Sequence, residues 1–323
     1  MTLQRREILK LATLTAASAI LPISTEAETS TRPILDAHIH LFDPTRPGGV
    51  PWPFKDDTVL YKPALPGRYE ALSKPFGVVG AIAIEASPLS SDNDWLLKVV
   101  ADHPIMVGAI GNLIPSSQNY ASELARLHKN PLFLGIRYGN LWDRNLAEDI
   151  TKPGFLDGLK ALAQANLVFE SANPNPSLVA VIRKIAELVP DLRIVIDHLP
   201  HAPVPTEKAA LEAYNADLHA LAQRPGVFVK LSEIPVVANG TLITDLHYYQ
   251  GPLDTIWNTF GEDRILFGSD WPNADTTAPF DQTLSIVRRY TATKSPSAAE
   301  KYYWKNSIAA YRWRPRRLGQ PAA

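Results

Sequence analysis

Two short motifs, far apart in the chain, carry the residue types that acid–base or metal chemistry needs. The first is Asp36–His40 (DAHIH), which ends an apolar run, and the second is Phe267–Pro272 (FGSDWP), which ends another. Side chains alternate between the two faces of a strand, so we expect His38 and His40 to share one face. Together with Asp270, these two imidazoles would form either a metal site or a general-base site.

The composition is that of an ordinary globular protein, with 323 residues, 46% of them hydrophobic, 20% charged, and a formal net charge of -1. A chain of this length can bury one large core, and α/β barrels reach this length as a single domain. The nearly balanced charge gives no support for nucleic acid or an anionic membrane as a partner. The sequence has no cysteine, which excludes disulfides, thiolate metal sites and a cysteine nucleophile.

Residues 1–27 have the pattern of an export signal. Arg5 and Arg6 form a basic start, and an apolar stretch rich in small residues follows at 8–23. Small residues two positions apart suit cleavage after Ala27. The paired arginines resemble the twin-arginine signal, which predicts a periplasmic protein. The alternative is an amphipathic N-terminal helix. The apolar run is too short and too broken for a membrane span, so no membrane anchor is expected after signal removal.

The rest of the chain, residues 28–323, alternates between β-type and helical segments. Five segments have apolar residues at helical spacing, at Asp92–Asp102, Tyr120–His128, Pro153–Ala165, Ser177–Leu188 and Lys208–Gln223. Eight runs have β-type composition, and most are apolar on both faces, as in a buried parallel sheet. They are Ile34–His40, Val78–Ala86, Ile105–Asn112, Leu132–Tyr138, Leu167–Ser171, Leu192–His198, Val227–Ser232 and Arg264–Asp270. This alternation predicts a single-domain (β/α)8 barrel of the TIM type.

An open doubly wound sheet is the alternative architecture. No Gly-x-Gly-x-x-Gly follows a predicted strand, so dinucleotide binding has no support. The long segment 43–68 is rich in proline and glycine, and we expect it to cover the mouth of the barrel. Polar residues gather at the C-terminal ends of the predicted strands, where such barrels place active sites. They are His38, His40, Glu85, Arg137, Glu170, His198 and Asp270.

Five motifs together resemble the amidohydrolase superfamily. They are Asp36–His40, Leu134–Arg137 (LGIR), Val195–His198 (VIDH), Val229–Ser232 (VKLS) and Leu266–Pro272 (LFGSDWP). More narrowly, they resemble its amidohydrolase 2 type and the lactonase branch, which includes 2-pyrone-4,6-dicarboxylate lactonase, sugar-acid lactonases and 4-sulfomuconolactone hydrolase. The resemblance runs from about Ile34 to Trp313, and it implies that Asp270 is the general base that activates water.

The residues also have interpretations of their own. An unpaired Asp270 at the end of an apolar strand needs a metal, a histidine or a proton, and the alternative is a cap for the segment that follows it. His198 is expected to point into the mouth, where it would polarise a carbonyl or hold water. Asp197 is expected to alternate away from His198 along the strand. Asp36 would orient the histidines or end the strand.

Two cations end predicted strands. Arg137 suits bidentate pairing with a carboxylate or sulfonate on the substrate, and the alternative is an ion pair with Glu170 or Glu85. Lys230 would stabilise a developing oxyanion, and the alternative is a salt bridge with Glu233.

The metal content stays open. Metal-loaded members of the superfamily usually carry a histidine on strand five and a lysine or glutamate on strand four, whereas this chain has Glu170 and Arg137, so a two-metal site is not expected. One divalent ion, zinc or manganese, held by His38, His40, Asp270 and Glu170 is compatible with the donor types. A metal-free mechanism is compatible as well.

The sequence therefore predicts a hydrolase that opens the lactone ring of a small acidic substrate, with Asp270, His198, His38 and His40 as catalytic residues. Arg137, Tyr61 and Lys230 would contact the substrate; for Tyr61 this rests on a loose match to the branch. Metal-dependent amide hydrolysis or decarboxylation of another small carboxylic acid is the nearest alternative, although the missing strand-five histidine disfavours a decarboxylase. A non-catalytic binding protein is a more distant alternative. Whether the chain forms a homo-oligomer stays open.

Overall fold

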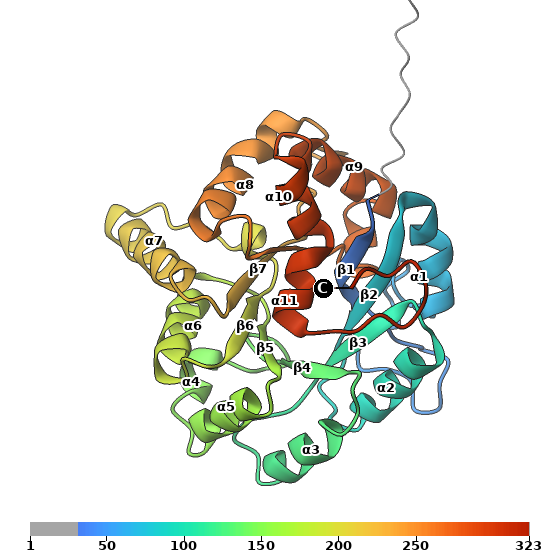
Figure 1. The fold of residues 1–323 in the computed structure, drawn as a ribbon, viewed down its shortest axis with the longest axis vertical. Helices are drawn as coiled ribbons and strands as arrows, with labels where there is room; N and C mark the ends of the chain where they lie inside the picture. Colours follow the sequence, from blue (N-terminus) through green and yellow to red (C-terminus); the bar gives the residue numbers. More distant parts are fainter. Residues whose placement is uncertain (1–31, 323) are drawn as a thin grey trace, which may run out of the picture. The chain divides into compact units, whose positions relative to one another are not determined.

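The computed structural model describes residues 32–322, and the predicted export signal lies outside them. Eight parallel strands form one sheet in the order β1-β2-β3-β4-β5-β6-β7-β10 (Figure 1). Their bounds are Ile34–His40 (β1), Val78–Ile84 (β2), Met106–Gly111 (β3), Phe133–Arg137 (β4), Val168–Ser171 (β5), Arg193–Ile196 (β6), Val227–Leu231 (β7) and Ile265–Phe267 (β10). Each of the eight predicted β-type runs contains one of these strands.

The sheet closes into a barrel between its first and last strands. A parallel bridge pairs Ile39 with Trp271. The His40 N–H donates to the Trp271 carbonyl at 2.7 Å, and the Asp270 N–H donates to the His38 carbonyl at 2.8 Å. These bonds leave no open sheet edge at the seam, and they bring the two motifs of opposite chain ends side by side. The predicted TIM-type barrel is confirmed.

Helices surround the barrel (Figure 1). The helix α6 illustrates why they form, since Asn175 caps the N–H of Leu178, and Pro176 takes the first helical position. No helix of residues 32–322 is long and apolar enough to cross a membrane. The surrounding helices are Pro66–Ser73 (α1), Asp92–Asp102 (α2), Tyr120–Leu127 (α3), Leu146–Asp149 (α4), Phe155–Gln164 (α5), Pro176–Leu188 (α6), Lys208–Ala222 (α7), Leu246–Phe260 (α8) and Phe280–Thr291 (α9).

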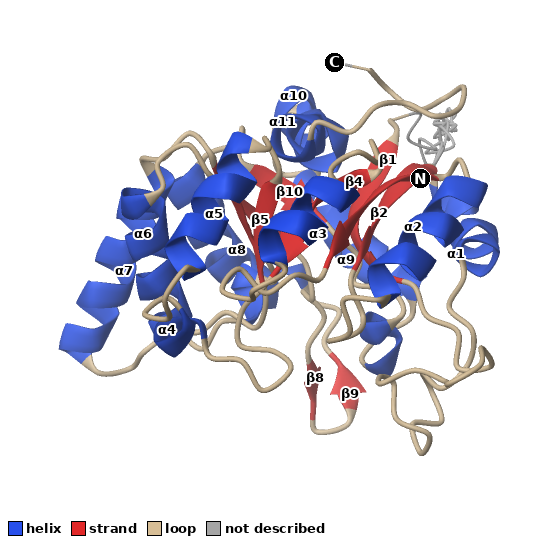
Figure 2. Cartoon of the chain, turned by 90° about the horizontal axis from the view of Figure 1, so that it is seen from below, coloured by secondary structure: helices blue, strands red, loops and turns tan. Residues whose placement is uncertain are grey.

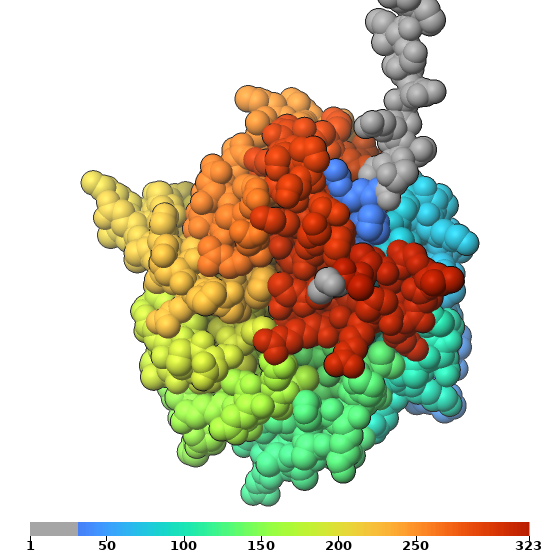
Figure 3. Space-filling model, viewed as in Figure 1, coloured from blue at the N-terminus to red at the C-terminus, as the bar shows by residue number. Residues whose placement is uncertain are grey.

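The C-terminal segment covers the end of the barrel where the strands begin. The helix α10 (Pro296–Glu300), a π-helical turn (Lys301–Lys305) and α11 (Asn306–Tyr311) run across this end (Figures 1 and 3). Asn306 donates to the carbonyl of Ile265, the first residue of β10, at 2.9 Å. An apolar cluster fills the barrel beneath this segment. It comprises Leu35, Ala37, Ile82, Ile84, Val107, Ile110, Leu134, Val168, Val195, Phe228, Leu266, Trp304, Ala310, Tyr311 and Trp313.

The opposite end of the barrel carries the loops that follow the strands. Figure 2 shows a small hairpin of β8 (Val237–Ala238) and β9 (Thr241–Leu242) projecting on this side, away from α10 and α11. Each strand of the hairpin has two residues, which is too short for a period-two pattern to predict. The predicted active-site end therefore holds the irregular segments, and the other end holds a helical cover.

Candidate active site

A cavity of about 310 Å³ lies among the loops at the carboxyl ends of the strands. This volume lies within the range of sites for small molecules. Two aromatic residues of the wall come from the segment 43–68, so this segment covers part of the mouth, as predicted. The wall consists of His40, Trp52, Phe54, Glu85, Ala86, Arg137, Leu141, Trp142, Asn173, His198, Glu233, Asp270 and Asn273.

Asp270 is fully buried on the wall of this cavity. Its Oδ2 accepts a hydrogen bond from the Asn273 amide at 2.6 Å, whereas Oδ1 has no hydrogen-bond partner. Three imidazole Nε2 atoms surround Oδ1, from His40 at 3.2 Å, His38 at 3.4 Å and His198 at 3.9 Å. Burial raises the pKa of Asp270 to about 6. The carboxylate is therefore ionised at neutral pH and basic enough to take a proton.

The three imidazoles are neutral at this pH. Burial lowers the pKa of His38 and of His198 well below the usual value, and it lowers that of His40 to about 4. Positive neighbours lower these pKa values further, above all Lys230 beside His38 and Arg137 beside His40. A neutral imidazole presents one N–H donor and one lone pair, so each ring can donate, accept or ligate.

Asp36 ties the two motifs together below the cavity. Its Oδ1 accepts from the N–H of His38 at 3.1 Å and from that of Ser269 at 2.8 Å, and its Oδ2 accepts from the Tyr69 hydroxyl at 2.7 Å. Gly268 completes the junction, because a Cβ there would lie 2.7 Å from the Cβ of His38. Asp36 thus orients the strand that carries the histidines, one of the two predicted roles.

Asp270 and His198 both have left-handed backbone conformations, with φ of 59° and 48°. Such conformations are uncommon for residues with a Cβ and gather at functional sites. The prediction that Asp197 points away from His198 is wrong, and the left-handed conformation of His198 is part of the reason. The strand β6 ends at Ile196, the alternation stops there, and both side chains face the barrel interior, where His198 Nδ1 lies 2.8 Å from Ser232 Oγ.

Arg137 lies on the cavity wall, and two carboxylates share its charge. Its Nε is 3.0 Å from Asp197 Oδ2, and its Nη1 is 3.8 Å from Glu85 Oε1. Glu85 also accepts from the indole N–H of Trp142 at 3.1 Å. Glu85 and Glu170 were the predicted partners of Arg137. Glu85 is one of the two carboxylates beside Arg137, and the other is Asp197 and not Glu170. Arg137 is the single lysine or arginine among the lining residues that the structure describes.

Lys230 lies below the cavity and is fully buried. Its Nζ is 2.6 Å from Glu170 Oε1, 3.0 Å from Asp197 Oδ1 and 3.0 Å from His38 Nδ1. The hydroxyl of Tyr311 donates to the other oxygen of Glu170 at 2.7 Å. Burial and the neighbouring Asp197 raise the pKa of Glu170, and Lys230 opposes this rise. The buried Lys230 ammonium therefore has three acceptor atoms within hydrogen-bond distance.

Four of the predicted site residues are not among the residues that line the cavity, namely His38, Tyr61, Glu170 and Lys230. Lys230 lies beneath the wall, and its carboxylate partners do not include Glu233, the predicted one. Glu170 faces Lys230 and not Asp270. The predicted metal ligands Glu170 and Asp270 therefore belong to different groups of converging ligand atoms. Tyr61 is absent from the lining residues in the described part of the chain. His38 is buried beside His40 and Asp270, and the remaining four, at positions 40, 137, 198 and 270, line the cavity.

Glu233 and Asn273 line the cavity without having been assigned to it from the sequence. The Asn273 amide donates to Asp270 Oδ2 at 2.6 Å and to Glu233 Oε1 at 3.2 Å, which bridges two carboxylates. Burial and the nearby Asp270 raise the pKa of Glu233 to about 8. Both residues follow strand-end motifs directly, Glu233 after Val229–Ser232 and Asn273 after Phe267–Pro272. This position is the signal that could have identified them.

The spacing of the atoms around the unpaired Asp270 oxygen matches the spacing of ligands on a small divalent cation. His38 Nε2, His40 Nε2 and Asp270 Oδ1 are separated by 3.2 to 3.4 Å. Ligands about 2.0–2.1 Å from a tetrahedral ion would be roughly 3.4 Å apart, and imidazole nitrogen with carboxylate oxygen is a common zinc set. His198 converges with two of these residues, His38 and Asp270, in a group whose ligand atoms lie within 4.8 Å of one another.

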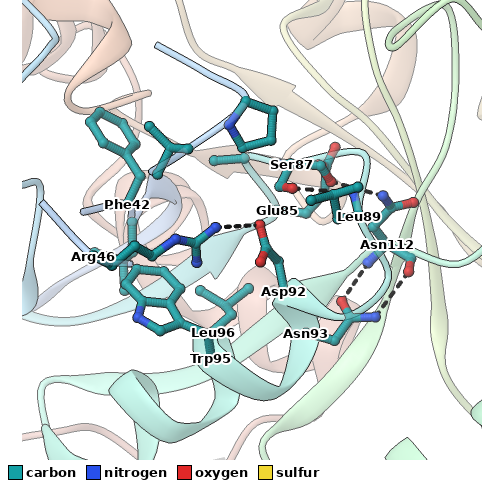
Figure 4. A pocket seen from close by; sticks show the side chains of 14 residues that line it. Phe42, Arg46, Glu85, Ser87, Leu89, Asp92, Asn93, Trp95, Leu96 and Asn112 are labelled. Carbon is teal, nitrogen blue, oxygen red and sulfur yellow. Dashed lines mark hydrogen bonds and ion pairs between the residues drawn. The ribbon is translucent and has the colours of Figure 1, made fainter. Parts of the chain in front are cut away.

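A smaller pocket shares Glu85 with the cavity wall (Figure 4). Its volume of about 20 Å³ is enough for one water molecule. An ion pair of Arg46 with Asp92 at 2.7 Å lies on one side. Hydrogen bonds between the side chain of Asn93 and the backbone of Asn112, at 2.8 and 2.9 Å, lie on the other. The arrangement supports the loop behind Glu85 and leaves no room for a substrate.

Known proteins resemble this chain over nearly all of its described length. The model of a family described as Amidohydrolase matches residues 35–313. An L-fucono-1,5-lactonase of Burkholderia ambifaria is 28% identical over 74% of this chain and 80% of its own, and one of Burkholderia multivorans is 26% identical over 85% and 94%. A crystal structure of an amidohydrolase from Burkholderia multivorans with bound zinc superposes with a TM-score of 0.75, at 21% identity over 87% of this chain and 99% of that chain.

Proposed function

Because this chain belongs to the amidohydrolase family, we propose that it hydrolyses the lactone ring of a small organic molecule. The observation that carries the proposal is the orphaned oxygen of Asp270, surrounded by three neutral imidazoles on the wall of a cavity of about 310 Å³. Two relatives named L-fucono-1,5-lactonase support the choice of a lactone over an amide.

The reaction needs a base, an oxyanion site and a proton for the leaving group. Asp270 Oδ1 takes a proton from a water molecule, and the resulting hydroxide attacks the carbonyl carbon of the lactone. Imidazole N–H groups from His38 and His198 stabilise the negative charge that develops on the carbonyl oxygen, and His40 presents a lone pair to the same site because its Nδ1 faces the Ile84 carbonyl. The bond between the carbonyl carbon and the ring oxygen then breaks, and Asp270 returns its proton to the leaving alkoxide. The product is a hydroxy acid.

A divalent ion, zinc or manganese, would be held by His38, His40, His198 and Asp270. When bound, it would supply a Lewis acid for the carbonyl oxygen and would lower the pKa of water. Elemental mass spectrometry of protein purified without added metal, with activity before and after chelation, tests this. Stoichiometric metal and activity lost on chelation would support these ligands, whereas full activity without metal would leave Asp270 as a direct base.

The wall of the cavity favours a lactone that carries hydroxyl groups. Glu85, Glu233 and Asn273 offer acceptors and donors that match hydroxyl groups. An anionic substituent would have to compete with Asp197 for the charge of Arg137, which lies 3.0 Å away. The acidic substrate expected from the sequence therefore stays a prediction, and a neutral sugar lactone is the better match.

A panel of lactones tests the proposal and its substrate class. Neutral sugar 1,5-lactones and lactones with a carboxylate would be compared by the acid that hydrolysis releases. We expect turnover of lactones, with the neutral sugar lactones preferred. If no lactone is opened while an amide is cleaved or an aromatic acid releases carbon dioxide, the alternative amidohydrolase reactions replace this proposal.

We also propose, from residues 1–27, that the protein is exported to the periplasm. The paired Arg5 and Arg6 followed by an apolar stretch support this location. Replacing both arginines by lysine should retain the full-length protein in the cytoplasm, as cell fractionation would show. An unchanged distribution would contradict the twin-arginine route.

A further inference from the structure

The contacts of Lys230 determine which ring nitrogen of His38 carries the hydrogen. A lysine ammonium has three N–H donors and no acceptor. Three acceptors lie at hydrogen-bond distance from Nζ, namely Glu170 Oε1 at 2.6 Å, Asp197 Oδ1 at 3.0 Å and His38 Nδ1 at 3.0 Å. One donor is available for each acceptor. His38 Nδ1 is therefore the unprotonated nitrogen, and the hydrogen of the neutral ring lies on Nε2.

His40 has the opposite arrangement. Its Nδ1 lies 3.2 Å from the carbonyl oxygen of Ile84. A carbonyl oxygen only accepts, so the hydrogen of His40 lies on Nδ1, and Nε2 presents a lone pair. His38 Nε2 and His40 Nε2 are 3.2 Å apart. This close approach needs one donor and one acceptor, which the two separate assignments supply.

We propose that Lys230 is a positioning residue that holds His38 as an Nε2–H donor and thereby opposes metal binding through this nitrogen. A histidine that ligates a metal almost always donates its other ring N–H to a carboxylate or carbonyl. Two carboxylates are present for that purpose, since Asp197 Oδ1 and Glu170 Oε1 lie 3.6 and 3.8 Å from His38 Nδ1. The Lys230 ammonium contacts Glu170 and His38 Nδ1 through hydrogen bonds and lies 3.0 Å from Asp197 Oδ1, so it takes the position of that bond.

The chemical consequence concerns the oxyanion. His38 Nε2 lies 3.4 Å from Asp270 Oδ1 and 3.2 Å from His40 Nε2, so its N–H lies beside the place where the water and the carbonyl group would meet. An N–H donor held in place before the reaction stabilises a developing negative charge. This consequence rests on the proposed lactonase function, whereas the position of the hydrogen and the affinity for zinc are measured without any substrate. Failure of the lactonase assay would therefore leave the assignment of the hydrogens intact.

The first experiment uses the full-length wild-type protein, freed of metal by chelation and labelled with ¹⁵N-histidine. Long-range ¹H–¹⁵N correlation spectra distinguish protonated from unprotonated ring nitrogens. The signals of His38 and His40 are identified by their loss in His38→Asn and His40→Asn variants. We expect the hydrogen on Nε2 in His38 and on Nδ1 in His40. A hydrogen on Nδ1 of His38 would overturn the proposal.

The second experiment replaces Lys230 by methionine. Without the ammonium, Asp197 and Glu170 are the neighbours of His38 Nδ1, so the hydrogen should move from Nε2 to Nδ1. The dissociation constant for zinc, measured by titration calorimetry, should then fall about tenfold or more, which is the usual effect of a hydrogen-bond partner behind a metal-ligating histidine. An unchanged hydrogen position together with unchanged zinc affinity would overturn the proposal.

Two further variants keep this test decisive. Tyr311→Phe removes a hydrogen bond to Glu170 but leaves the contact between Lys230 and His38, so both readouts should stay at the wild-type value. If Lys230→Met does not fold because two buried carboxylates lose their counter-charge, the double variant with Glu170→Gln removes one of those charges. It retains Asp197 as acceptor and should show the same shift of the hydrogen and the same gain in zinc affinity.

Discussion

The two ends of the barrel interior are filled by opposite kinds of side chain. Where the strands begin, Leu266 and Val195 belong to one apolar cluster together with Trp313 of the C-terminal segment. Where the strands end, the interior holds fully buried charged groups, among them Lys230 and Asp270. All eight strands thus contribute apolar residues to one end, and several of them carry, or lead directly into, ionisable residues at the other.

Backbone strain follows the same division. Nine residues other than glycine have positive φ in the described part of the chain, and five of them line the cavity. They are Trp142, Asn173, His198, Glu233 and Asp270. Buried charges and left-handed conformations both destabilise a fold, so the surrounding structure has to hold them in place. Burial of apolar residues at one end therefore stabilises the barrel, and this stabilisation offsets the cost of holding reactive groups in place at the charged end.

Asp270→Asn should give the largest effect at the charged end. If Asp270 is the base, kcat should fall by about 10² to 10⁴-fold, the usual contribution of general-base catalysis. The melting temperature should stay the same or rise, because a neutral amide replaces a buried carboxylate with one unpaired oxygen. Asp281→Asn, at an exposed position of α9, is the control and should leave both quantities unchanged. An active, folded Asp270→Asn protein would contradict the mechanism.

Trp313→Ala tests the apolar end. Trp313 is buried, and its indole N–H donates to Ser307 Oγ at 3.0 Å. Removing a buried tryptophan side chain should lower the free energy of unfolding by about 3–5 kcal/mol, as urea denaturation would measure. The kcat of the folded protein should stay close to that of the wild type. A loss of kcat without a loss of stability would show that the division between the two ends is wrong.

Much of the fold could be predicted from the sequence, because buried parallel strands are apolar on both faces and stand out as runs. The five predicted helices occur with ends within two residues of the prediction. The helix α8 was missed because Gly251 and Pro252 lie inside it. Both residues disfavour helix interiors, and packing against the barrel overrides this preference.

The candidate site was predictable where a residue ends a strand and less so elsewhere. His38, His40 and Asp270 meet because the first and last strands are neighbours in a closed barrel. Lys230 shares a face of β7 with Phe228, which belongs to the apolar cluster inside the barrel, so alternation along the strand places Lys230 in the interior. Its pairing with Glu170 could not be predicted, because the contact depends on the register of three separate strands.

Trp142→Phe should have a moderate effect confined to the charged end. The indole N–H donates to both oxygens of Glu85, at 3.1 and 3.3 Å, and phenylalanine retains an aromatic ring without this donor. One hydrogen bond contributes about 1 kcal/mol, so KM should rise up to about tenfold while kcat changes little. Trp95→Phe is a matched control, because Trp95 stacks under Arg46 at the smaller pocket. An unchanged KM would contradict a role of Glu85 in substrate binding.

Tyr311→Phe should have the smallest effect, although Tyr311 belongs to both ends. Its ring packs in the apolar cluster, and its hydroxyl donates to Glu170 at 2.7 Å. Phenylalanine keeps the packing and removes one hydrogen bond, so the free energy of unfolding should fall by about 1 kcal/mol. The kcat should stay at the wild-type value, because Lys230 still holds Glu170 and still donates to His38. Steady-state kinetics beside urea denaturation measures both quantities. A reduced kcat would mean that the helical cover controls the reactive end through this hydroxyl, and the two ends would have to be treated as one coupled network.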